Sequence, residues 1–333
     1  MATLFESVTQ ALTPDITRQV GKAVGLDTDL VSKGMSVVGP LVTGSLASQA
    51  SSPMGLEGIM NMLPKDTGMP AMSSLGTILG SLSGRSAGTS ESNVLGAGSS
   101  AIAGTIDKAL GFKASSLLPL AAPFVMNLLR QRITTERLDP QGVARLLQDE
   151  HTTFTQAGSP TASLVTTALE AGQQAAATKA KYSEELWTKV RLAPAAAGEL
   201  VIEASSSGMV GRLKELTALT SAITSAAKEA TPTSLVALAL DSPLEQSELD
   251  KLGQDKASFV NTLETAMSAV STSSPNDLPA YSQFLVTIAT QVAESAKEGG
   301  FLGIGGTRVS NEERAAIDQV RAIAGLAQRK AGS

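Results

Sequence analysis

Apolar side chains recur every three or four residues along most of the chain, and this spacing predicts α-helices. A clear example lies near the C-terminus, where Ile317, Val320 and Ile323 share one helical face. Nowhere do β-branched residues alternate with polar residues for long enough to indicate a strand. The pattern therefore predicts an all-α fold built from helical bundles.

Several helix starts carry recognisable capping sequences. Asp139-Pro140 places a good N-cap residue before a proline at the first helical position, and Thr231-Pro232 repeats that arrangement. Ser310 and Glu313 form the serine-to-glutamate spacing of a capping box. We expect a helix to begin at each of these three places.

The first part of the chain contains a loose internal repeat of a helical hairpin. Each copy predicts a helix that ends at a glycine, a short turn, and an apolar helix bent by a proline. The glycines are Gly25 and Gly111, and the prolines are Pro40 and Pro123. We interpret the two copies as a duplication that packs two similar hairpins together.

Charged residues are distributed unevenly, which indicates two domains. Residues 1–130 hold eight acidic and eight basic side chains, whereas residues 131–333 hold 23 acidic and 18 basic ones. A chain of 333 residues also has the usual length of about two domains. We predict a helical domain at residues 1–135, a connecting helix and linker at 136–160, and an acidic helical bundle at 161–333.

Two apolar stretches carry a family resemblance. Residues 41–56, together with residues 117–129, resemble the YidB-like group of bacterial proteins, and the likeness covers residues 1–135. This resemblance implies a small all-α domain of unknown function and supplies no catalytic residues. Residues 187–198, 204–208 and 293–306 are similar to an uncharacterised bacterial helical module.

Composition argues against several kinds of function. The net charge of −5, the absence of any basic run and the 3% of aromatic residues argue against nucleic-acid binding. The chain has no Cys, which excludes disulfides, thiolate nucleophiles and Cys-ligated zinc. With a single His, it also lacks the multi-histidine sets that commonly hold zinc. We expect neither a metal nor a cofactor.

Two uncharged stretches raise the question of a membrane span. Residues 34–56 are diluted by polar residues and glycine, and residues 114–129 contain Pro119 and Pro123. The second stretch is shorter than the ~20 apolar residues that a spanning helix needs. Buried core helices are the better interpretation. The chain also begins without a basic region followed by an apolar one, so we expect a cytoplasmic protein.

No candidate catalytic group has the partners that its chemistry requires. His151 lies among polar residues late in a predicted helix, which is typical of an exposed side chain. Ser225 and Lys228 match a serine–lysine spacing but lack the accompanying motifs of penicillin-recognising enzymes. The glycine-rich residues 299–306 follow no predicted strand, so a packing loop is favoured over a phosphate site.

The remaining pattern favours contacts between proteins. Five of the ten Met residues lie between positions 54 and 72, and flexible Met side chains suit adaptable binding surfaces. The sparse charge of residues 1–130 reduces repulsion between copies. The predicted interaction surface consists of Val37, Val38, Leu41, Val42, Leu46, Met54, Met60, Met62, Leu120, Phe124, Val125 and Leu128.

These observations lead to three ranked hypotheses about function. The first is a non-catalytic helical protein that acts by self-association as a homo-oligomer or by binding another protein. The second is a binding protein that encloses an apolar or acyl ligand between its helices. The third is an enzyme without a recognisable signature.

Overall fold

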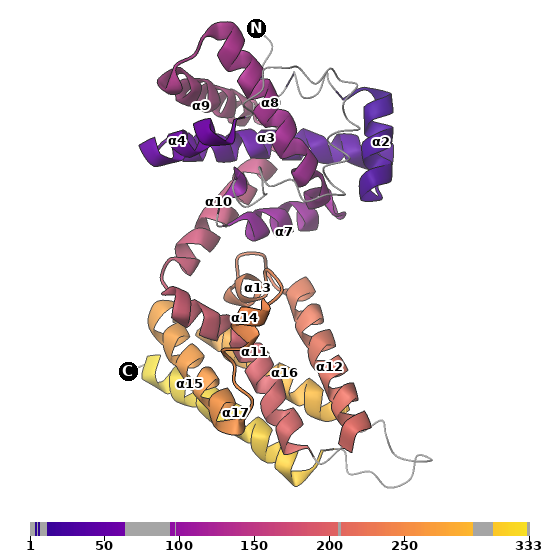
Figure 1. Ribbon diagram of the computed structural model, residues 1–333, viewed down its shortest axis with the longest axis vertical. Coiled ribbons are helices and arrows are strands. Elements are labelled where there is room, and N and C mark those ends of the chain that lie inside the picture. Colours follow the sequence, from indigo (N-terminus) through magenta and orange to yellow (C-terminus); the bar gives the residue numbers. More distant parts are fainter. Residues whose placement is uncertain are drawn as a thin grey trace. The chain divides into compact units, whose positions relative to one another are not determined.

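The computed structural model describes Leu4, Glu6 and residues 12–63, 94–96, 98–205, 208–295 and 309–331. Within these ranges every regular element is a helix and none is a strand (Figure 1). The predicted all-α class is confirmed.

The chain forms two compact units, Met1–Ala176 and Ala177–Ser333. This division differs from the predicted one, which placed a linker at residues 136–160 and began the second domain at residue 161. The difference arises because residues 140–156 and 160–176 form helices that contribute buried side chains to the first unit. Each unit is described by itself below.

The first unit contains eight described helical elements. They are α2 (Pro14–Val24), α3 (Thr28–Ala50), α4 (Pro53–Met62), α7 (Ser99–Leu110), the 3-10 helix η2 (Ala114–Leu117), α8 (Leu118–Glu136), α9 (Pro140–Gln156) and α10 (Pro160–Lys179). The last residues of α10, 177–179, belong to the second unit.

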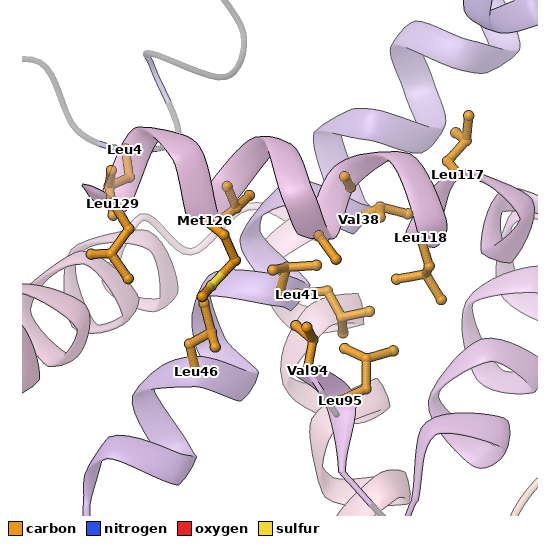
Figure 2. Packing of buried hydrophobic residues seen from close by; sticks show 14 of the residues in the cluster. Leu4, Val38, Leu41, Leu46, Val94, Leu95, Leu117, Leu118, Met126 and Leu129 are labelled. Carbon is orange, nitrogen blue, oxygen red and sulfur yellow. The ribbon is translucent and has the colours of Figure 1, made fainter. Parts of the chain in front are cut away.

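Helix α3 forms the centre of the first unit. It contacts α2, α4, η2, α8 and α9, and it carries no charged residue after Lys33. Figure 2 shows Leu41 and Leu46 of α3 among buried side chains of α8, such as Met126. A helix with an uncharged stretch of this length is stable in water only when other helices cover it, and here they do.

Polar residues of α3 also hold a distant segment in place. The Ser45 hydroxyl and the Gln49 side-chain amide both donate to the Val94 carbonyl oxygen, at 2.9 and 2.5 Å. Val94 and Leu95 are buried in the same core. These polar side chains of α3 therefore supply two donors to a carbonyl group within the core.

The local features of both predicted hairpins are present. Helices α2 and α7 end at Gly25 and Gly111, whose φ angles of 72° and 76° lie in the left-handed region. Pro40 lies inside α3 and Pro123 inside α8. The glycine stops and the internal prolines are confirmed, while the duplication stays an interpretation of the sequence.

The second unit is a helical bundle in which α11 contacts α12, α13, α14, α15, α16 and α17. Its described helices are α11 (Glu184–Ala204), α12 (Gly208–Glu229), α13 (Leu235–Ala239), α14 (Gln246–Leu249), α15 (Lys256–Ser273), α16 (Leu278–Ser295) and α17 (Asn311–Ala331).

Two of the three predicted helix starts are confirmed. The Gly142 amide donates to Asp139 Oδ1 at 2.7 Å, and Ser310 and Glu313 exchange both hydrogen bonds of a capping box. The prediction at Thr231-Pro232 was wrong. There the Ser234 amide donates to the Thr231 carbonyl in a turn, and α13 begins only after Ser234.

Trp187 is an interior residue of the second unit, as its helical pattern indicates. Its side chain is 7% exposed, and its ring lies 5.4 Å from that of Tyr182 and 5.7 Å from the Lys179 ammonium. We expect blue-shifted native emission, because the indole is shielded from water. Acrylamide should quench this emission weakly, and free quenching would contradict the burial.

Candidate functional site

Most of the predicted interaction surface is not at the surface. The structure buries seven of its twelve residues in the core of the first unit, with exposed fractions of 5% or less. These residues are Val37, Val38, Leu41, Val42, Leu46, Leu120 and Val125. The prediction was wrong for them, because α3 and α8 pack against each other, and further helices of the same unit cover α3.

The remaining five residues are more accessible to solvent. Phe124 and Leu128 of α8 are half-buried and pack against the core, as do Met60 and Met62 of α4. Met54 is 84% exposed. The accessible part of the predicted surface therefore includes α4. Its first turn carries Met54, the most exposed large apolar side chain among the described residues.

The start of α4 is fixed by its sequence. The Gly55 amide donates to the Ser52 hydroxyl at 3.1 Å, and Pro53 occupies the first turn, where its missing N–H costs nothing. A Cβ atom at Gly55 would lie 2.1 Å from the Gln49 carbonyl oxygen. Only glycine allows α4 to turn back this closely against the end of α3.

The second glycine of α4 has opposite surroundings. A Cβ atom added at Gly58 would meet no atom within 4 Å, whereas Ile59 next to it is fully buried. Met54, Gly58 and Met62 are spaced four residues apart and therefore follow one side of the helix. We call these three residues the Met–Gly–Met stripe. It combines a bare backbone with a flexible apolar side chain at each end.

Electrostatics do not oppose the approach of an apolar surface to this stripe. Between Gly34 and Leu63 the chain has one charged residue, the exposed Glu57. A stripe of this kind fits another protein better than it fits a polar small molecule.

His151 does not stand free on the surface, and the prediction that it does was wrong. Its ring is half-buried on α9 and packs against α3 at Gly44, where a Cβ atom would lie 2.9 Å from Nδ1. Burial lowers the pKa of His151 by desolvation. The polar neighbours of His151 in sequence indicated exposure, but the missing side chain at Gly44 lets the ring approach the α3 backbone.

A second exposed apolar patch was not predicted from the sequence. Leu213 and Leu216 lie one turn apart on α12 and are 67% and 36% exposed. Their charged neighbours Arg212 and Lys214 are exposed as well. Two leucines at helical spacing are typical of a buried face, so the sequence carried no signal that they face solvent.

The described residues show no catalytic arrangement. Ser225 and Lys228 are exposed on α12, and their side chains form no hydrogen bond with each other. No group of three or more His, Asp or Glu side chains in the described ranges lies close enough to hold a metal ion. The glycine-rich residues 299–306 lie outside the described part of the chain.

One described helix, α3, is long and apolar enough to cross a membrane by length and composition alone. In the structure, 78% of its most apolar window is buried inside the first unit. A core helix of a soluble domain passes the same test, so this finding is weak evidence for a membrane span.

Comparison with protein families assigns only the N-terminal part of the chain. Residues 6–132 match the model of a bacterial protein of unknown function, DUF937. The N-terminal part resembles this family. The expected YidB-like resemblance is thereby confirmed, and the DUF937-like region ends within α8, before α9 and α10 complete the first unit. No curated protein and no solved structure matches the chain.

Proposed function

We propose that the protein is a non-catalytic helical protein that self-associates through the Met–Gly–Met stripe of α4. The observation that carries this proposal is the 84% exposure of Met54 in line with the open backbone of Gly58. So exposed an apolar side chain, one helical turn from a glycine with open space where a side chain would stand, favours a contact with a further helix. We also propose a cytoplasmic location and no nucleic-acid partner.

A second copy of this chain is the occupant that the stripe favours. The stripe reads the same from either end of α4, with Gly58 in the middle and a Met four residues away on each side. In a two-fold contact the same patch is used by both copies, so a patch of this kind is self-complementary. An antiparallel copy of α4 would place its Met62 against Met54.

Gly58 would set how closely the two helices approach. Because it has no side chain, the backbones meet at short range, and the two Met side chains close over the contact from both sides. Few charges lie nearby, so repulsion between the copies is small. The contact area of a single short helix is modest, and we therefore expect reversible association.

The test is the substitution Met54→Glu in the full chain, followed by sedimentation over a range of concentrations. We expect the wild type to associate and the variant to dissociate more readily. The dissociation constant should rise by about 30-fold or more, as for the loss of an interface residue worth ~2 kcal/mol. Met54 is exposed, so the variant should fold normally.

Leu213→Glu supplies the matched control. It places the same charge at another strongly exposed apolar residue, on α12 of the second unit. We expect this variant to associate as the wild type does. A wild type that stays monomeric at high concentration contradicts self-association. If Leu213→Glu loses association and Met54→Glu does not, the contact lies on α12 and the proposal for α4 is wrong.

A further inference from the structure

Three helices of the first unit meet at one glycine of α3. A Cβ atom at Gly44 would lie 2.9 Å from Nδ1 of His151 on α9 and 2.8 Å from Cδ1 of Leu169 on α10. Helices α9 and α10 therefore approach the bare α3 backbone at the same place. His151 is the single His of the chain, and it occupies this junction.

The buried side of the imidazole faces apolar surroundings. Its Nδ1 atom has no accessible surface and no hydrogen-bond partner. A neutral imidazole needs one donor and one acceptor, whereas an imidazolium carries a full charge and donates from both nitrogens. Adding a proton therefore leaves Nδ1 without a partner, now as the donor of a charged ring, and places that charge in the apolar junction.

No charged group of the packed helices is placed to offset that charge. Residues 34–50 of α3 contain no charged side chain, and Glu170 of α10 is exposed. On α9, Asp149 is also exposed, and Glu150 accepts a hydrogen bond from the Leu4 amide. On α4, which also contacts α9, Glu57 is exposed. Desolvation is the cause that lowers the pKa of His151, and no neighbouring carboxylate raises it.

We propose that His151 is an acid-sensitive switch whose protonation loosens α9 and α10 from α3. Above the ordinary histidine pKa of about 6.5 the ring is neutral in both the folded and the unfolded chain, and the junction is fully stable. As the pH falls below this value, the unfolded chain takes up a proton before the folded one does. The stability that the neutral His151 junction gives to the first unit is lost progressively until the pH reaches the lowered pKa of the folded state.

The coupling between protonation of His151 and unfolding has a defined upper limit. Within that window one proton separates the two states, so the unfolding constant of the first unit rises by up to about tenfold for each unit of pH. Unperturbed Asp and Glu side chains titrate near pH 4, below the range of about pH 5.5–7 over which the switch is tested. The proposal is independent of the α4 contact, because it concerns folding of a single chain.

The experiment compares urea unfolding of the full chain at about pH 7 and about pH 5.5. Helix content by circular dichroism follows both units, and the fluorescence of Trp187 follows the second unit alone. At the lower pH, the wild type should lose stability in the unfolding transition of the first unit. This is the transition that circular dichroism detects and Trp187 fluorescence does not. His151→Gln, which cannot titrate, should lose this dependence on pH.

Two results would overturn the switch. One is the same pH dependence in the wild type and in His151→Gln. The other comes from proton NMR of the folded wild type, in which the single imidazole gives resolvable ring signals. If these signals titrate at or above the ordinary histidine value, the folded state does not disfavour the proton. This second measurement needs no variant, so it stands even where His151→Gln fails to fold.

Discussion

Replacing Val42 with Glu is expected to destabilise the first unit by about 4 kcal/mol, because the carboxylate would be buried without a partner. Val42 is fully buried in α3, and no charged side chain of α3 lies between residues 34 and 50. A loss of this size is a large part of the ~5–15 kcal/mol that stabilises a typical domain. Urea unfolding followed by circular dichroism should show an early transition, while Trp187 emission keeps its wild-type midpoint.

Ser48→Glu is the control for the Val42 variant. Ser48 is exposed on the same helix, so the same charge there should change stability by less than about 0.5 kcal/mol. A Val42→Glu variant with the wild-type midpoint would show that α3 is not the centre of the unit. The substitution is therefore a test of the core, and it is unsuitable as a test of self-association.

Replacing Tyr281 with Phe is expected to destabilise the second unit by about 1–3 kcal/mol. Pro194 lies inside α11 and has no N–H, so the Val190 carbonyl loses its partner within the helix. The fully buried Tyr281 hydroxyl donates to this carbonyl oxygen at 2.5 Å, and burial raises the pKa of Tyr281. Without the hydroxyl, a buried acceptor remains unsatisfied.

A double-mutant cycle with Pro194→Ala tests that reason. Alanine restores an N–H that can reach the Val190 carbonyl, so Tyr281→Phe should cost about 1 kcal/mol less in the Pro194→Ala background. Urea unfolding followed by Trp187 fluorescence measures all four proteins. Additive effects within about 0.3 kcal/mol would show that the hydroxyl does not replace the missing helical hydrogen bond.

The candidate surface was only partly predictable. Met54 belongs to the predicted surface because it begins a Met-rich segment, and the structure exposes it. The open surroundings of Gly58 were not foreseen, since Gly55 and Gly58 are alike in sequence. One approaches the Gln49 carbonyl and the other faces open space. This difference in surroundings arises because Gly55 lies against the last turn of α3 and Gly58 does not. The position where α3 ends is not determined by either glycine.

The helices and many of their ends follow from local sequence patterns. The stops at Gly25 and Gly111 and the caps at Asp139 and Ser310 depend on interactions within a few residues, so short patterns predict them. The periodicity that places Trp187 on an apolar face is equally local. These features follow from backbone hydrogen bonding and side-chain preference, and they do not require the rest of the fold.

What covers each apolar face depends on how distant helices pack together, and local patterns do not predict it. Val42 and Val125 prefer burial, but the pattern is the same whether a second copy or another helix of the same unit covers them. His151 has polar neighbours in the sequence, yet its ring packs against α3, because Gly44 on that distant helix leaves room for it. Periodicity records which side chains avoid water, whereas their partners are set by contacts between helices far apart in the chain.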